Sequence, residues 1–273
     1  AWLQKKRHHA WEQFQELPFP SFRYGIGIFA DVSALALEEI DPLQGEDMQS
    51  IQAEEGIEVL SFQQAIEKDP QLLQDYFHKE TAYAHKLIAL HEAFFNHSLF
   101  IKIPENKIFK KPIALKIDMH AKARIDTLFI IAEKNSSAVI IEMIASSEKK
   151  EQTFRSQRVE ILVKENAKIS YYTTQNLHKQ AYQFIHRKAS VARNASLFWI
   201  DCSLGSKFTQ MNTQTFLEGE GAEGKSWNIV FGDAAQCFDI NTITHHVASR
   251  TVSDMLTRIV LNEEAKAIYR GLI

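Results

Sequence analysis

The sequence predicts a mainly β protein in which stacked coils form a β-helix, preceded by a helical segment. Three observations predict this fold class. All six prolines lie within the first 112 of the 273 residues, and the remaining 161 residues contain none. Strand-like runs fill the proline-free part, and a turn containing Asn or Gly recurs between them. We therefore expect helices and loops over residues 1–98 and the β-helix core over residues 99–273.

The first region predicts three helical segments separated by loops. Apolar residues between Trp2 and Leu17 fall near helical spacing, and the prolines at 18 and 20 end that helix. Two further segments are expected over 62–77 and 84–96, the last with an apolar stripe that is typical of core packing. Residues 41–58 contain several acids and an Asp-Pro pair, which indicates an exposed loop.

Alternation of apolar and charged residues identifies strands in the second region. Val159, Ile161 and Val163 alternate with charged neighbours, and a period of two places them on one face of a strand. Similar runs, rich in β-branched and aromatic residues, are 113–117, 127–132, 138–144, 169–174, 197–200, 238–244 and 255–261. Each strand of a stacked coil donates hydrogen bonds to its neighbours, which agrees with the absence of proline.

A recurring turn sets the expected coil length. Asn106, Asn135, Asn166, Asn194 and Gly221 each lie between two strand-like runs, at intervals of 29, 31, 28 and 27 residues. Asn and Gly tolerate the left-handed backbone that a tight corner needs. A later Glu-Glu-Ala segment at 263–265 resembles these turns but comes 43 residues after Gly221. The hairpin turns of a meandering sandwich are missing, so the pattern favours a β-helix, with a β-sandwich as the alternative.

Composition and charge argue against several classes of function. The net charge of −3, from 34 acidic and 31 basic residues, gives no electrostatic basis for binding nucleic acid or an acidic membrane. No apolar run approaches the roughly 18 residues of a membrane span, and the start lacks a secretory signal. Cys202 and Cys237 are too few for a disulfide framework, which indicates a reducing compartment. We expect a cytoplasmic protein.

The strongest candidates for metal ligands lie in one strand-like run. They are His245, His246, Cys237 and Asp239. Adjacent residues of a strand point to opposite faces, so the two imidazoles cannot reach one ion. We therefore expect no metal here, with one histidine outward and solvated and the other inward and hydrogen-bonded. Cys202 and Cys237 are expected to be buried and inert, and Cys202 to line the core.

Nucleophile and phosphate-binding motifs are absent from the sequence. The glycine-rich segment 217–224 lacks the Lys-Ser/Thr ending of a phosphate loop, and its three glutamates would repel phosphate. We interpret it as a tight turn. No Gly-x-Ser-x-Gly elbow occurs either. The sequence therefore predicts a protein that is not an enzyme.

Several longer motifs remain to be explained, at 93–96, 100–104, 191–195, 216–224, 231–233, 238–242, 245–246, 253–254 and 267–273. They resemble the SufB/SufD family of iron–sulfur cluster assembly scaffolds, and its SufD branch more than its SufB branch. They occur in the order of the family and cover residues 85–273 well, and the helical N-terminus loosely. The resemblance implies a right-handed β-helix flanked by helical segments.

The resemblance also implies a function and partners. Members pair with a SufB-like subunit and recruit a SufC-like ABC ATPase through a C-terminal helical region. The complex builds or holds nascent Fe–S clusters with sulfur from a cysteine desulfurase, and SufD-like subunits support iron entry without turnover of their own. We expect no cofactor on this chain alone, and a transient Fe–S cluster or iron only in the complex. A homodimer or a heterodimer with SufB is expected near the C-terminal coils, through Met255, Arg258, Tyr269 and Arg270.

Three departures from the family pattern matter. SufB-type chains carry a sulfur-accepting cysteine in the strand that matches 213–216, and this chain has none there, which favours SufD. The family continues past Ile273, so we expect a truncated chain, with the interface histidine and the SufC-binding helices outside this sequence. The N-terminal signature of the family is replaced by Phe-Arg-Tyr-Gly at 22–25, which leaves the role of that segment open.

Two other classes of protein compete with the scaffold. A β-helical carbohydrate-active enzyme such as a polysaccharide lyase needs clustered acids for calcium and an Arg or Lys base. Arg158, Arg187 and Arg193 are present, but no Asp cluster recurs at the coil period. A plain interaction module is the other alternative, because the edge strands of a solenoid are natural docking surfaces.

Overall fold

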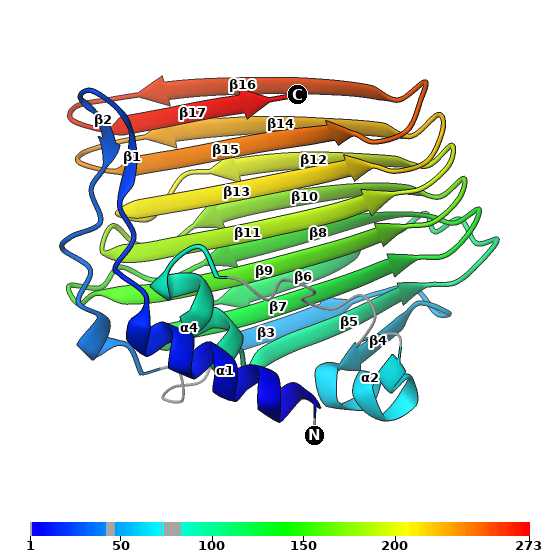
Figure 1. Ribbon diagram of the computed structural model, residues 1–273, viewed down its shortest axis with the longest axis horizontal. Coiled ribbons are helices and arrows are strands. Elements are labelled where there is room, and N and C mark those ends of the chain that lie inside the picture. Colours follow the sequence, from blue (N-terminus) through cyan, green and yellow to red (C-terminus); the bar gives the residue numbers. More distant parts are fainter. Residues whose placement is uncertain (1, 42–46, 72, 74–82) are drawn as a thin grey trace.

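Two long parallel sheets face each other in the computed structural model, which describes residues 2–41, 47–71, 73 and 83–273. Each coil gives one strand to each sheet, and about six turns stack into a right-handed β-solenoid (Figure 1). The predicted β-helix is confirmed, with two strands in each coil. None of the helices in the described ranges is long and apolar enough to cross a membrane.

The strands of the solenoid form two sheets, which we call the odd sheet and the even sheet after the strand numbers from β5 onward. The odd sheet contains β4 (Glu58–Ser61), β5 (His97–Ile103), β7 (Ala123–Ala132), β9 (Thr153–Val163), β11 (Ala181–Val191), β13 (Phe208–Leu217), β15 (Cys237–His246) and β17 (Lys266–Leu272). The even sheet contains β3 (Met48–Gln52), β6 (Ile113–Asp118), β8 (Ser137–Ala145), β10 (Lys168–Asn176), β12 (Ser196–Ser203), β14 (Glu223–Gly232) and β16 (Val252–Leu261). Strands of successive coils pair in parallel, whereas β3 and β4 pair antiparallel with β6 and β5.

The predicted turns form the corner that leads from each odd strand to the next even strand. Asn106, Asn135, Asn166 and Asn194 have φ between 52° and 61°, and Gly221 has φ 74°. The Asn135 amide donates to Asn106 Oδ1 at 2.8 Å, and the Asn166 amide donates to Asn135 Oδ1 at 2.9 Å. The asparagine side chains at this corner therefore stack from coil to coil. Their backbones adopt the left-handed conformation that the turn requires.

The irregular interval near the C-terminus has a simple geometric cause. The residue that follows Gly221 at the same corner is Arg250, 29 positions later, with φ 56°. Glu263 (φ 54°) belongs to the opposite corner, where Ala234 (φ 52°) precedes it by 29 positions. Glycine is required at position 219 because the backbone of the preceding coil passes close to it: a Cβ there would lie 2.0 Å from Arg193 N. The coil period therefore continues without interruption.

Helices and a hairpin cover the outer face of the odd sheet. They are α1 (Trp2–Glu16), the hairpin of β1 (Phe22–Gly25) and β2 (Ile28–Ala30), the 3-10 turn Leu37–Glu39, α2 (Phe62–Lys68) and α4 (Lys86–Phe94). In Figure 1 the hairpin runs along one end of the odd strands toward the last coils. Ser61 and Gln64 form a capping box that starts α2.

The N-terminal expectations are met in part. Helices occur in all three predicted segments, although 74–77 of the second lie outside the described residues. The expectation of a loop over 41–58 was wrong for β3 and for the start of β4, which extend the two sheets. Most residues of β3 are exposed to solvent, so the strand lacks the apolar residues by which the other strands were predicted. The division at residue 98 remains a prediction.

Two apolar cores lie on either side of the odd sheet. Inside the solenoid, inward residues of both sheets pack together, among them Ile130, Ile161 and Trp199. Outside, Phe129, Phe154 and other outward residues of the odd strands pack against α4 and the N-terminal segment. The outer face of the even sheet has no described helix over it (Figure 1). The two sheets therefore differ sharply in what their outer faces contact.

Candidate functional site

The first candidate is a chain of charged side chains inside the solenoid. Arg155 of β9 donates to both oxygens of Asp126 at 3.1 Å and to Glu142 at 2.5 Å. Glu142 also accepts a hydrogen bond from Tyr171 at 2.5 Å. Arg124 continues the chain from Asp126 to Asp47, with nitrogen–oxygen distances of 3.3 and 3.0 Å. These charged residues come from β7, β8, β9 and the segment before β3, so the network ties successive coils together.

A second buried pair extends this polar half of the interior. Arg187 of β11 donates to Asp201 of β12, and Thr173 donates to the same carboxylate. The Arg187 guanidinium lies 5.5 Å from the ring of Tyr171 and 5.4 Å from that of Trp199. Both partners of the ion pair are less than 4 % exposed. Buried ions of this kind are tolerated only when paired, so these side chains hold one another in place.

The electrostatics of this interior favour fixed charges over proton transfer. Burial alone would lower the pKa of Arg155, but Asp126 and Glu142 outweigh it and the pKa is raised. Burial and Glu142 raise the pKa of Tyr171 well above its usual value. An arginine that stays charged and a tyrosine that stays neutral over the accessible pH range are structural partners rather than acid–base catalysts.

Sequence reasoning did not find this network, although a signal was present. Arg124 and Asp126 precede Leu128 and Ile130 at a spacing of two, and Glu142 lies between Ile140 and Ile144. A charge at an inward position of an alternating strand indicates a buried ion pair. The partner could not be identified, because it lies on another strand of the solenoid and only the strand register defines it.

The second candidate surrounds Asp239 on the outer face of β15. Asp239 is fully buried, accepts a hydrogen bond from Tyr24 of the hairpin, and accepts another from Arg270 at 2.9 Å. The Arg270 guanidinium lies 3.6 Å from the centre of the Tyr24 ring. Burial and Asp239 raise the pKa of Tyr24. The cluster therefore fastens the N-terminal hairpin to the last two odd strands, and its carboxylate is occupied by protein donors.

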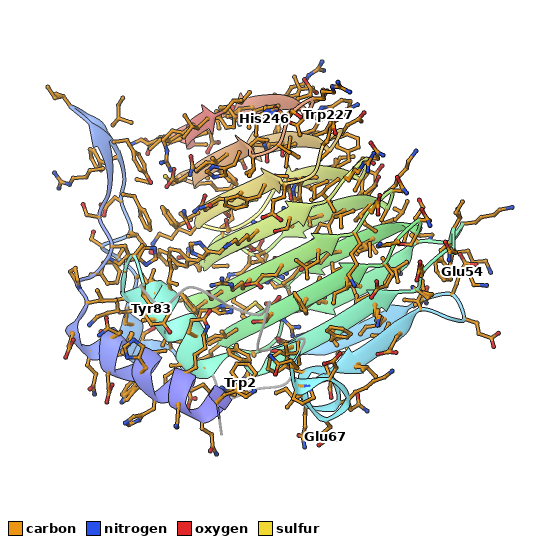
Figure 2. The ribbon with its side chains drawn as sticks, turned by 45° about the vertical axis from the view of Figure 1, so that its right-hand side comes forward. Trp2, Glu54, Glu67, Tyr83, Trp227 and His246 are labelled. Atoms are coloured by element: carbon orange, nitrogen blue, oxygen red, sulfur yellow. The ribbon has the colours of Figure 1, made fainter. Side chains whose placement is uncertain are left out.

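The histidine pair diverges, as the strand geometry requires. His245 faces outward with its ring stacked on Phe216 at 4.3 Å and an interplanar angle of 6°, so it is half-buried rather than solvated. His246, at the exposed end of β15, contacts Thr251 Oγ1 at 2.7 Å and Ser253 Oγ at 2.8 Å (Figure 2). Within the described ranges no three His, Cys, Asp or Glu side chains are grouped so that they could hold a metal ion.

Both cysteines differ from the buried state that we expected. Cys202 faces outward on β12 and is half-exposed, so the expectation that it lines the core was wrong. The strand extends to Ser203, and the alternation places Asp201 and Ser203 inward instead. Cys237 faces outward on β15 beneath the hairpin, and burial with the nearby Asp239 raises its pKa to about 11. A protonated thiol of this kind is a poor nucleophile and a poor metal ligand.

The four residues predicted at an interface lie in the last described coil. Met255 and Tyr269 occupy inward positions of β16 and β17, and Tyr269 packs against a small core cluster with Ile240 and Phe238. Arg258 occupies an outward position of β16, and Arg270 is engaged with Asp239. They therefore do not form one surface patch. Their role in a contact between proteins stays a prediction.

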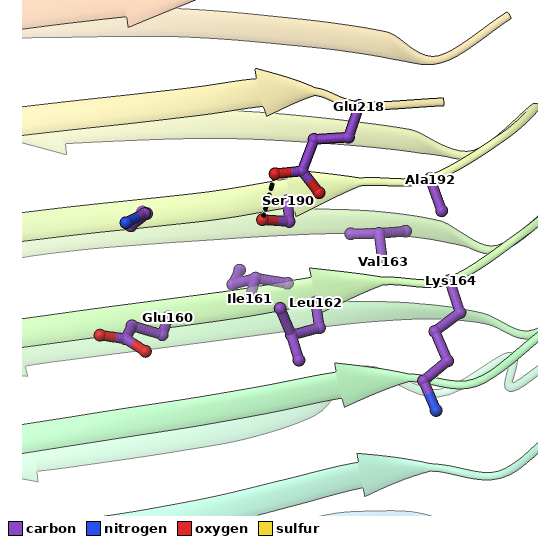
Figure 3. A pocket seen from close by; sticks show the side chains of 9 residues that line it. Glu160, Ile161, Leu162, Val163, Lys164, Ser190, Ala192 and Glu218 are labelled. Carbon is purple, nitrogen blue, oxygen red and sulfur yellow. Dashed lines mark hydrogen bonds between the residues drawn. The ribbon is translucent and has the colours of Figure 1, made fainter. Parts of the chain in front are cut away.

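A shallow pocket lies on the outer face of the odd sheet beyond the helices. Its volume is about 370 Å³, and its polar lining comprises Glu160, Lys164, Lys188, Ser190 and Glu218. Figure 3 shows Ser190 donating to Glu218 across neighbouring strands, at 3.3 Å. Its lining mixes acidic and basic side chains, and Lys164 is paired with Glu133, a residue outside the lining, at 2.8 Å. The pocket therefore offers no concentrated charge for one kind of ligand.

These features define a class of protein. The molecule is a parallel β-solenoid in which buried ion pairs link strands of its two sheets. Comparison with known protein families shows to which family the chain belongs. The chain belongs to the SufBD family: residues 116–273 match the SufBD core domain of the SUF system for FeS cluster assembly, and residues 41–115 match the SufBD protein N-terminal region.

Curated relatives carry the same family name. The chain is 28% identical over 223 residues to an "Iron-sulfur cluster assembly SufBD family protein" of Staphylococcus epidermidis, which covers 81% of this chain and 48% of that protein. Proteins of Staphylococcus haemolyticus and Staphylococcus aureus with the same description match with the same identity and coverage. The chain thus spans about half the length of the curated relatives it matches.

Proposed function

We propose that the chain is part of a SufD-type, non-catalytic subunit of an iron–sulfur cluster assembly scaffold in the cytoplasm. The observation that carries this proposal is the match of most of its solenoid, residues 116–273, to the SufBD core domain. The absence of cysteine from 213–216 supports the SufD branch, because this stretch of β13 has no thiol to accept sulfur. Two unpaired thiols suit a reducing compartment.

The placement of the charges supports a structural rather than a catalytic role. The interior carboxylates Asp126 and Glu142 are both paired with Arg155. A polysaccharide bound to the outer surface would not reach them, so a lyase is the weaker candidate. We therefore propose that iron or a nascent cluster binds transiently in the assembled complex. We propose no cofactor that this chain binds on its own.

The proposed partners are a SufB-like subunit and a SufC-like ABC ATPase, with a homodimer as an alternative to the SufB pair. We propose that the contact with the SufB-like subunit includes the last described coil, near Met255, Arg258, Tyr269 and Arg270. In the described part of the chain, β16 and β17 each have a sheet neighbour on one side only. Strand edges of this kind pair readily with another chain.

Depletion of the natural protein from its host tests the proposed function. The specific activity of enzymes that need Fe–S clusters, such as aconitase, should fall, while enzymes without clusters keep theirs. Restoring the protein should restore the cluster enzymes. Unchanged aconitase activity after complete depletion, in cells that have no second assembly system, would contradict the proposal.

A further inference from the structure

A small chamber lies inside the solenoid, where the two buried ion networks approach each other. Its walls come from β9 and β11 of the odd sheet and from β8, β10 and β12 of the even sheet, which belong to successive coils (Figure 1). The first network contributes Glu142 and Arg155 to the lining, and the second contributes Arg187 and Asp201. The chamber therefore belongs to the polar half of the interior.

Three side chains of this lining have polar atoms that the described residues leave without a hydrogen-bond partner. Gln183 is 0 % exposed, and neither its Oε1 nor its Nε2 has a partner there. The same holds for Oε1 of Gln157, which is 1 % exposed, and for Nε of Arg187, which is 3 % exposed. Polar atoms buried to this extent are almost always hydrogen-bonded, because leaving them unpaired is costly. They therefore indicate a bound molecule.

The strand register brings these three side chains around one position of the odd sheet. Gln157 of β9 pairs in register with Ile185 of β11. Gln183 precedes Ile185 by two residues and Arg187 follows it by two, so all of them point into the solenoid. The long side chains of Gln183 and Arg187 thus flank the place that Gln157 faces.

The unpaired atoms require a molecule that both donates and accepts hydrogen bonds. The orientation of the Gln157 amide is fixed, because its Nε2 donates to Asp126 Oδ2 at 3.0 Å and to Glu142 Oε1 at 2.6 Å. Turning this amide over would place its oxygen against two carboxylates, so Gln157 Oε1 needs a donor. Arg187 Nε needs an acceptor, and the Gln183 amide needs one of each.

Size and charge restrict the molecule further. The space open to the centre of a water-sized molecule is about 10 Å³, which is close to the least that one water molecule needs. Glu142 is paired with Arg155 at 2.5 Å, and Asp201 is paired with Arg187. The charges around the chamber are therefore already matched, and an ion would add a buried charge without a counter-ion. A neutral molecule of this size that donates and accepts hydrogen bonds is water.

We propose that the chamber is a binding site for an ordered water molecule, which bridges Gln157 Oε1, the Gln183 amide and Arg187 Nε. Buried waters typically make about three hydrogen bonds to groups of this kind. The water connects the first ion network, through Gln157, with the second, through Arg187, so that both act as one hydrogen-bonded unit from β7 to β12. This site goes beyond the proposed function and does not depend on it.

A high-resolution crystal structure of the natural full-length protein tests the proposal directly. It should show an electron-density peak in the chamber at about 2.7–3.2 Å from Gln157 Oε1 and from polar atoms of Gln183 and Arg187. No peak, or direct hydrogen bonds from these atoms to other protein groups, would overturn the proposal. Soaking the crystals in rubidium identifies a monovalent cation by its anomalous signal, and such a signal in the chamber would also overturn it.

Oxygen-17 relaxation dispersion provides a test in solution, because it counts internal waters that exchange slowly. Gln183→Met keeps the length of the side chain and removes both polar atoms, so the number of long-lived waters should fall by about one. Gln214→Met is the matched control at a half-exposed outward position of β13, and it should leave the number unchanged.

Circular dichroism verifies that both variants are folded. An unchanged number of long-lived waters in folded Gln183→Met, or an equal fall in the control, would contradict the proposed site. If Gln183→Met does not fold, the crystal structure of the wild type decides by itself.

Discussion

Single residues inside the solenoid carry charges that only their partners make tolerable. Arg155 is 2 % exposed and is the link between Asp126 and Glu142, which lie on strands of different sheets. Removing one member of a buried ionic group leaves the others unpaired, which costs more than the pair contributes. The interior is therefore more sensitive to loss of one charge than to loss of a methyl group.

Arg155→Met should destabilise the protein by roughly 3–5 kcal/mol, because the buried Glu142 loses its counter-ion and Asp126 keeps only Arg124. Equilibrium unfolding in urea measures the change. Arg193→Met is the control, because Arg193 is exposed at a corner, and it should change the free energy of unfolding by less than about 0.5 kcal/mol. A loss of under about 1 kcal/mol for Arg155→Met would show that the network is not stabilising.

The corner asparagines allow backbone strain to be separated from side-chain stacking. Asn135 has φ 55° and exchanges hydrogen bonds with Asn106 and Asn166. Asn135→Ala should lower the free energy of unfolding by about 1–2 kcal/mol, because the left-handed backbone is strained for alanine and both side-chain hydrogen bonds are lost. Asn135→Gly keeps the backbone conformation and loses only the bonds, so thermal unfolding should place it between the wild type and the alanine variant. Equal losses for both variants would mean that the backbone conformation does not matter there.

At the scale of elements, α4 joins the outer face of the odd sheet through buried imidazoles. His91 contacts Ser156 Oγ at 2.9 Å and Thr127 Oγ1 at 3.0 Å. The nearby His85 packs edge-on against Phe22 of the hairpin, with ring centroids 5.8 Å apart. Burial lowers the pKa of both His85 and His91 to about 4. Both rings are therefore neutral in the folded protein at pH 7.

Stability should fall as the pH is lowered from about 6.5 towards 4. The unfolded chain takes up protons on these histidines near their ordinary pKa of about 6.5, whereas the folded chain does so only near 4. Between pH 7 and pH 5 the loss should be about 2 kcal/mol for each imidazole. His85→Phe removes one of them, so its urea-unfolding free energy should depend less on pH. An unchanged pH dependence would contradict this assignment.

Elements with a local signature could be predicted, and those defined by tertiary contacts could not. Five corners were found because Asn or Gly occupies the left-handed position of the turn, whereas Arg250 gave no such signal at the next corner. Strands β8 and β9 were found because their alternation is regular. Strand β14 was missed, since Gly224 and Gly232 occupy inward positions where apolar residues are expected. Strand β11 was missed because His186, Arg187 and Lys188 are consecutive polar residues, and nothing local shows that Arg187 alone points inward, where it pairs with Asp201.

The candidate sites followed the same division. Strand alternation correctly separated His245 from His246 without any structure. The contact of Tyr24 with Asp239 spans 215 positions, and no periodicity in the sequence indicates it. Likewise, the alignment of Trp227 with Tyr172 on one face depends on the register of two strand pairs. Residue types are local information, whereas their neighbours in the solenoid are not.

At the scale of the whole molecule, the solenoid has two faces of different kinds. The N-terminal helices and hairpin cover part of the odd sheet, whereas no described helix covers the even sheet, and β16 and β17 are the edge strands of the described part. A scaffold subunit needs such surfaces more than it needs a cleft. The proposed function therefore depends on the proteins that bind to these surfaces.

Native mass spectrometry of the full-length protein, expressed with its SufB-like and SufC-like partners, tests this most directly. The account predicts one complex that contains all three proteins and gains the mass of an Fe–S cluster after reconstitution with iron and a cysteine desulfurase. It also predicts that the protein alone gains no such mass. A protein that remains apart from both partners, or that assembles a cluster by itself, would contradict it.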